Sequence, residues 1–219
     1  MASRPKQAPP RPAPRLYLIT PPIADAAAFS PQLAAALDAG DVAAVLLRLV
    51  EADERTRINR IKALLAPVQD KSAALLLDGH AELVARAGAD GAHLTGIASF
   101  IEAIEQLKPE RIAGAGGLVT RHDAMFAAER GTDYVMFGEP DADGKRPAFP
   151  AIEERVAWWA EVFEIPCVGY AASLDDIAPL VAAGTDFVAL GDFLWQNPHE
   201  ITATITEAGR YLRLPETAT

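Results

Sequence analysis

Short apolar runs alternate along the chain with longer segments in which apolar residues recur every three or four positions. The short runs are apolar on both faces and are bounded by Gly, Pro or Asp, which is typical of parallel strands covered by helices. They predict strands at residues 16–20, 42–49, 73–77, 91–94, 111–113, 134–137, 167–169 and 187–190. The longer segments predict helices at residues 31–39, 54–65, 81–87, 100–107, 121–130, 152–163, 174–183 and 198–212. Eight strands that alternate with eight helices predict an α/β protein.

A repeated motif stands before four of these strands. It is clearest in residues 184–191 and 131–138, and related forms occupy residues 88–94 and 40–47. In each copy a Gly is expected to end a helix in the left-handed conformation, and an Asp is expected to make the turn into the strand. The copies are 43 to 53 residues apart, so each interval holds two strand–helix units. This spacing predicts a (β/α)8 TIM barrel, with a doubly wound open sheet as the alternative.

Polar residues just before the helical segments predict where the helices begin. Asp53 and Thr120 are expected to cap the second and fifth helices, and Ser30, Ser99 and Ser173 are expected to cap the first, fourth and seventh. A Pro directly after Ser30 fits the first position of a helix.

The first 14 residues have a different composition from the rest. They contain five prolines and three basic residues, and they lack the apolar segment of a signal peptide. We therefore expect a disordered, Pro-rich basic tail at residues 1–14 and a single barrel domain at residues 15–219.

Composition restricts the function further. The chain has 219 residues, half of them hydrophobic, with a net charge of −10. An acidic protein of this kind is a poor partner for nucleic acid or an anionic membrane. The single Cys167 excludes an internal disulfide, and no apolar run reaches the roughly 20 residues of a membrane span. We expect a soluble, cytoplasmic protein that binds a small molecule.

In a barrel of this class the reactive side chains lie in the loops that follow the strands. Arg48, Lys145 and His80 are the candidate catalytic residues: two cations and one acid–base group. Asp78 is the candidate ligand for a metal ion. The candidate substrate- and phosphate-binding residues are Arg48, Gly116, Gly117, Lys145, Ala171, Ala172, Gly191 and Asp192.

Several of these residues also have a structural interpretation. Arg48 could simply form an ion pair with Asp78. Residues 114–117 could form an anion-binding nest or a plain turn. His93 is expected to lie in the core or behind the site. Of the adjacent Trp158 and Trp159, which should not share a helix face, one is expected on the barrel and the other is a candidate dimer contact.

The order of the segments 17–20, 45–48, 89–94, 131–135 and 184–186 resembles thiamine phosphate synthase and its tautomerase-like relatives. The resemblance covers about residues 16–195, and the Gly-Ala-Asp-Gly-Ala-His-Leu segment at 88–94 is its most specific part. It implies a (β/α)8 fold, a homodimer, and coupling of a pyrimidine diphosphate to a thiazole phosphate with Mg²⁺ and loss of diphosphate. In the family pattern it implies roles for Arg48 and Lys145.

Other positions depart from that pattern. A glutamine and a lysine of the second strand are Leu46 and Val50 here, a pair of glycines after the seventh strand is Ala171–Ala172, and a serine after the eighth is Asp192. Three functions therefore stay open: a divergent thiamine phosphate synthase, a non-catalytic or repurposed barrel that binds another small molecule, and an isomerase that uses His80 or His93.

Overall fold

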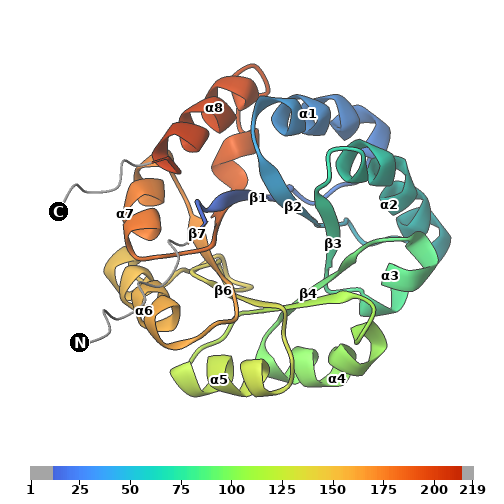
Figure 1. Cartoon of the computed structure of the whole chain (residues 1–219). Coiled ribbons are helices and arrows are strands. Elements are labelled where there is room, and N and C mark those ends of the chain that lie inside the picture. The colour runs from blue at the N-terminus through green and yellow to red at the C-terminus, as the bar shows by residue number, and fades with distance from the viewer. Residues whose placement is uncertain (1–11, 214–219) are drawn as a thin grey trace, which may run out of the picture.

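The computed structural model describes residues 12–213, and these form a closed barrel of parallel strands inside a ring of helices (Figure 1). The strands are β1 (Arg15–Ile19), β2 (Val42–Leu47), β3 (Ala74–Asp78), β4 (Gly91–Thr95), β5 (Ile112–Gly116), β6 (Tyr134–Phe137), β7 (Cys167–Ala171) and β8 (Phe187–Leu190). Strand β1 pairs with β2 on one side and with β8 on the other, so the sheet has no edge. The predicted TIM barrel is confirmed, and the open sheet is wrong.

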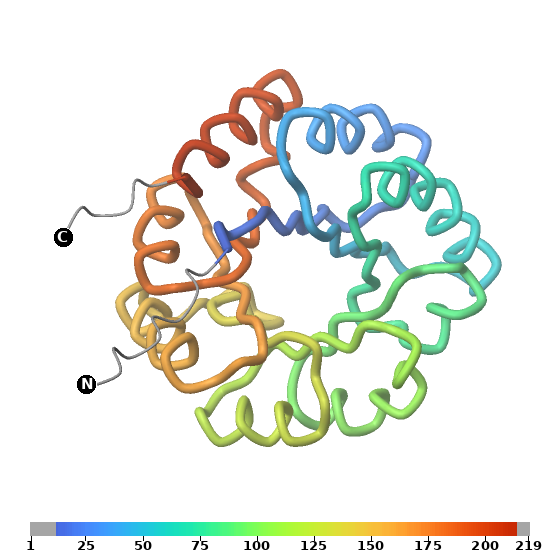
Figure 2. Tube along the Cα trace, viewed as in Figure 1, coloured from blue at the N-terminus to red at the C-terminus, as the bar shows by residue number. Residues whose placement is uncertain are grey.

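One main helix follows each strand around the barrel, as the trace in Figure 2 shows. The α-helices are α1 (Ala26–Ala39), α2 (Glu54–Gln69), α3 (Ala81–Ala87), α4 (Ile97–Leu107), α5 (Arg121–Glu129), α6 (Phe149–Val162), α7 (Ile177–Ala182) and α8 (Ile201–Tyr211), and the 3-10 turns are η1 (Leu174–Asp176) and η2 (Asp192–Trp195). One apolar cluster fills the space between strands and helices, and a smaller one fills the barrel interior. No helix in the described part of the chain is long and apolar enough to cross a membrane.

The repeated motif precedes β2, β4, β6 and β8, as its spacing predicted. Its Asp does more than make a turn, because the carboxylate of Asp186 accepts the Cys167 backbone N–H at the start of β7 (2.9 Å). Asp133 makes the same bond to Ala113 in β5, and Asp90 makes it to Leu75 in β3, both at 2.7 Å. Each of these three copies therefore ties its own strand to the one before it, at the amino end of the barrel.

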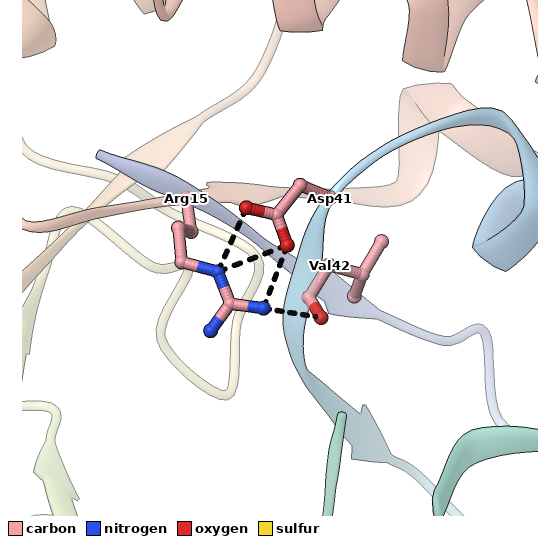
Figure 3. A network of polar contacts seen from close by, with 3 residues as sticks. All are labelled: Arg15, Asp41 and Val42. Carbon is pink, nitrogen blue, oxygen red and sulfur yellow. Dashed lines mark hydrogen bonds and ion pairs between the residues drawn. The ribbon is translucent and has the colours of Figure 1, made fainter. Parts of the chain in front are cut away.

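The first copy of the motif departs from the other three. Its glycine, Gly40, has extended backbone rather than the expected left-handed conformation. The carboxylate of Asp41 instead binds the Arg15 guanidinium on β1 at 2.7 Å, and Arg15 also donates to the Val42 carbonyl (Figure 3). This bonding holds the pKa of Asp41 below its ordinary value. The ion pair therefore ties β1 to β2, just as the direct carboxylate–amide bond ties the strands of the other three copies.

Three of the five predicted helix caps are wrong, and helices α6 and α8 begin three residues away from their predicted starts, at Phe149 and Ile201. Helix α1 begins at Ala26, because Asp25 accepts the Ala27 and Ala28 N–H groups; Ser30 is therefore not a cap. Helix α4 begins at Ile97, two residues before Ser99. A 3-10 turn with no side-chain cap at Ser173 precedes α7. Asp53 and Thr120 are caps as predicted, and Thr120 forms a capping box with Asp123.

The fifth strand was predicted too short. It runs over Ile112–Gly116, so three of the four residues considered for an anion-binding nest or a plain turn belong to the sheet. The pattern was missed because residues 114–116 are Gly-Ala-Gly, which lacks the β-branched residues that mark strands. The predicted tail lies mostly outside the described residues, and the division into tail and barrel stays a prediction.

Candidate active site

A cavity of about 500 Å³ opens at the carboxyl end of the barrel. We call it the mouth cavity, and its polar lining comes from loops and strand ends far apart in sequence: Arg48, Asp78, His93, Thr95, Glu139, Asp141, Tyr170 and Asp192. A second cavity of about 360 Å³ adjoins it, shares Glu139 and Asp141, and reaches Gly117, Lys145 and Arg146. The mouth cavity brings together Arg48, Asp78 and Asp192, as predicted from their positions at the carboxyl ends of strands.

Arg48 is held firmly at the rim of this cavity. Its backbone N–H donates to the Thr20 hydroxyl (3.0 Å), and its guanidinium donates to the Thr20 carbonyl. The guanidinium also forms an ion pair with Asp192, not with Asp78 as one interpretation of the sequence had it. Arg48 follows β2 and Asp192 follows β8, and only the closed barrel, in which β1 alone separates these strands, brings them into contact.

A buried chain of polar groups leads from the barrel interior into the mouth cavity. The Tyr17 and Tyr134 hydroxyls lie 2.8 Å apart, and the Tyr134 hydroxyl lies 3.0 Å from His93 Nδ1. On its other side, His93 Nε2 lies 3.8 Å from a Glu139 carboxylate oxygen. Burial is the main cause that raises the pKa of both tyrosines above the ordinary value, so they stay neutral donors. His93 therefore lies in the core and also reaches the site.

Glu139 and Tyr134 were missed as functional candidates. The signal that points to them is the pair of glycines in β5. A Cβ on Gly116 would come within 2.1 Å of Glu139 Oε1, and one on Gly114 within 2.0 Å of the Tyr134 ring. The glycines of this strand therefore make room for the polar chain.

The backbone amides predicted to bind phosphate already have partners. The Gly117 N–H donates to the Glu139 carboxylate, and the Ala172 N–H donates to the Asp176 carboxylate at 2.7 Å. Ala171 is the last residue of β7 and is fully buried. At Gly191 a Cβ would lie 2.0 Å from the Tyr170 hydroxyl, so this glycine is needed for packing.

The loop after β6 folds back on itself. The Asp141 carboxylate accepts the N–H groups of Asp143 and Lys145, and the Lys145 side chain points to solvent, 79% exposed and 3.8 Å from Asp143. Arg146 fixes the loop to the barrel, because it donates to the carbonyls of Gly138 (2.7 Å) and Tyr170 (3.0 Å). Lys145 thus lines the adjoining cavity but not the mouth cavity.

His80 lies apart from both cavities. It occupies the N-cap position of α3 in left-handed backbone without a side-chain capping bond, and its ring faces Arg57 Nη1 at 3.1 Å and Glu82 at 3.4 Å. Since His93 lies on the cavity wall and His80 does not, His93 is better placed for acid–base chemistry at the mouth.

The residues do not build a metal site by themselves. Asp78 lines the mouth cavity, but no group of three or more His, Cys, Asp or Glu side chains in residues 12–213 is arranged to hold a metal ion. A family that uses Mg²⁺ would need a second carboxylate or substrate oxygens here. We assign no step to a metal.

Residues 16–193 match the sequence model of the family described as thiamine monophosphate synthase. The chain belongs to the thiamine monophosphate synthase family. Its curated relatives include the thiamine-phosphate synthase of Rhodospirillum centenum, 40% identical over 91% of this chain and 98% of that protein. The thiamine-phosphate synthase of Hyphomonas neptunium is 38% identical over 86% of this chain and 89% of that protein.

The solved structure of another protein has the same fold as this chain. Thiamine phosphate pyrophosphorylase from Pyrococcus furiosus superimposes with a TM-score of 0.73 over 91% of this chain and 95% of that one, at 19% identity. The family and the fold are therefore those that the motifs at residues 88–94 and 184–186 implied.

Proposed function

We propose that this chain is a transferase of thiamine biosynthesis that couples a pyrimidine diphosphate to a thiazole phosphate, releasing diphosphate and forming thiamine phosphate. The observation that carries the proposal is the near-full-length similarity, up to 40% identity, to proteins named thiamine-phosphate synthase. The mouth cavity, with Arg48 on its wall, supports it as the place where a small molecule would bind. The proposal includes a cytoplasmic location and no nucleic-acid or membrane partner.

In this proposal Arg48 is the residue that contacts the leaving diphosphate. Its guanidinium is oriented by the Thr20 carbonyl, and a cation fixed in this way can stabilise the negative charge that grows on the departing group. To do so it must exchange the Asp192 carboxylate for a phosphate oxygen. Lys145 would have to turn inward from solvent to contribute. His93, next to Glu139, is the group that could hold or move a proton at the cavity wall.

Direct turnover tests the proposal. Purified protein is incubated with Mg²⁺ and both substrates, and thiamine phosphate is measured by fluorescence after oxidation. We expect product from the native chain and a loss of about 100-fold or more in the Arg48→Ala variant, the size seen when one stabilising donor is removed.

The matched control is Arg210→Ala, which removes an arginine that is 72% exposed on α8 and does not line the mouth cavity. It should retain native turnover. If the native chain makes no product at any substrate concentration, thiamine phosphate synthesis is not its function. Equal turnover in native and Arg48→Ala proteins would remove Arg48 from the site.

A second candidate function is a repurposed barrel that binds another, uncharged or cationic, small molecule. The observation that favours it is the lining of the mouth cavity, which presents four carboxylates and a single cation, Arg48. Such a lining opposes a diphosphate and attracts a positive ligand. In the same assay this candidate predicts no product and no rise in melting temperature with either phosphorylated substrate.

A further inference from the structure

The smaller apolar cluster of the barrel interior leaves a third cavity, of about 250 Å³, at the amino end of the barrel. We call it the amino-end cavity, and its walls come from β1, β2, β3, β5, β6, β7 and β8, near the points where these strands begin. No residue in the described part of the chain lines both this cavity and the mouth cavity. The two cavities thus lie at opposite ends of the barrel.

Small side chains on two neighbouring strands create the amino-end cavity. Ala43, Ala44 and Ala74 line it from β2 and β3, where the interior of such a barrel usually holds bulky branched residues. The pairing of β1 with β2 also shifts register here, because one step along β1 corresponds to two along β2, which leaves Ala43 as the extra residue of a bulge. Bulges are frequent at the rims of barrels and next to functional sites. The space at this end is therefore built into the strands.

The lining of the amino-end cavity favours an uncharged aromatic ligand. The rings of Tyr17, Tyr134 and Phe187 form part of its wall, and aromatic rings pack well against one another edge to face. The Asp133 carboxylate, which also lines the cavity, is already bound to a backbone N–H at 2.7 Å and to Lys108 at 2.5 Å. A charged ligand would lose its water among apolar side chains without gaining a counter-ion.

The two tyrosines also connect this cavity to the mouth. Their hydroxyls lie 2.8 Å apart, and the Tyr134 hydroxyl lies 3.0 Å from Nδ1 of His93, which lines the mouth cavity. A ring in the amino-end cavity therefore contacts a side chain that is one hydrogen bond away from the candidate active site.

We infer that the amino-end cavity is a second binding site, which takes a small uncharged aromatic molecule with one or two rings. Its volume supports this size, because an apolar cavity of about 150 Å³ is enough to bind benzene. The inference does not rest on the proposed function, because it assigns no ligand to the mouth. Binding at the amino end and turnover at the mouth can therefore succeed or fail separately.

The test uses indole as the probe and measures its dissociation constant for the full chain by calorimetry, without turnover. We expect saturable binding of a single indole to each chain, with a dissociation constant of about 1 mM or lower, which a ligand of this size can reach. Ala44→Leu and Ala74→Leu each fill the cavity and should weaken binding about tenfold or more, because the added side chain occupies the space of the ring. Ala74 is only partly buried, so its variant is less able to disturb folding, and circular dichroism checks the fold of both.

The control is Ala142→Leu, the same substitution on the wall of the mouth cavity, which should leave the dissociation constant for indole unchanged. Weaker binding in this control would place indole in the mouth and overturn the inference. So would a native chain that shows no saturable binding of indole, or a folded Ala74→Leu variant that binds indole as well as the native chain does.

A second probe tests the inference on the native chain alone. Indoleacetate carries the same ring with a carboxylate, and it should bind about tenfold or more weakly than indole, because the charge is placed among apolar side chains. Equal affinity for the two probes would contradict the inference even if neither filled variant folds.

Discussion

At the scale of single residues, Tyr134 connects the core to the site. Its hydroxyl lies 2.8 Å from the Tyr17 hydroxyl and 3.0 Å from His93 Nδ1, and its ring stacks on His93 with centroids 5.8 Å apart. The side chain is buried, so these partners replace the water that the hydroxyl would otherwise bind. Tyr134 therefore holds the His93 ring in position by a polar contact and by stacking.

The buried tyrosines make the protein sensitive to alkali. An unfolded tyrosine ionises near pH 10, whereas burial keeps the folded pKa of Tyr17 and Tyr134 higher. The folded state binds more protons above pH 10, so the contribution to stability is complete below pH 10 and is lost as the pH rises beyond it. We expect the free energy of unfolding, measured in urea, to fall steeply above pH 10.

Tyr134→Phe sharpens this prediction. At pH 7 it should lower the free energy of unfolding by about 1–3 kcal/mol, because Tyr17 and His93 each lose a buried partner. Above pH 10 its slope against pH should be smaller than that of the native chain, since one ionising group is gone. Tyr211→Phe on α8 is the control and should change neither quantity. An unchanged slope in Tyr134→Phe would contradict this account.

At the scale of elements, the repeated motif works as a strand tie. In its last copy, the Thr185 hydroxyl lies within hydrogen-bond distance of the Cys167 and Phe187 carbonyls, while Asp186 accepts the Cys167 N–H. Thr132 and Asp133 do the same for β5 and β6. The motif thus joins neighbouring strands at the amino end of the barrel.

Asp186→Ala tests this role. Loss of a charged acceptor leaves the Cys167 N–H without its carboxylate, and we expect a loss of about 1.5–3 kcal/mol in the free energy of unfolding. Asp175→Ala, an exposed acidic residue in η1, is the control and should stay within about 0.5 kcal/mol of the native value. Denaturation in urea gives both numbers. Equal stability of the two variants would show that the motif serves only as a turn.

At the scale of the whole molecule, the resemblance to its family implies a homodimer, which stays a prediction. Trp158, the candidate dimer contact, already has partners within the chain: Arg121 lies 4.7 Å from the centre of its ring, and the Trp159 and Phe163 rings meet it edge-on. Trp159 is fully buried against the barrel, as expected of one of the two tryptophans, and Trp158 is only partly buried.

Sedimentation velocity measures the assembly directly. We expect a species of twice the 23.3 kDa mass of one chain at micromolar concentration. A mass of 23.3 kDa at all concentrations would exclude the homodimer. The measurement is repeated at high salt, because a net charge of −10 on each chain opposes association and salt screens that repulsion.

The sequence by itself determined the fold class and the family. Both rest on periodic features, the alternation of strands with helices and the motif that recurs before every second strand, and such features survive many changes of single residues. It also located the strand ends, and so placed Arg48, Asp78 and Asp192 at one mouth. Boundaries failed where local signals compete: Asp25 caps the first helix before Ser30, and the glycines of β5 conceal a strand.

Only the tertiary structure decided which groups meet. Closure of the barrel brings Arg48 into contact with Asp192. The folding of the loops brings Glu139 to His93 and to the Gly117 N–H, and it brings Asp176 to the Ala172 N–H. A hydrogen bond depends on distances of a few ångströms, and no spacing along the chain specifies such distances between separate loops. The charge of the mouth is therefore a property of the folded barrel.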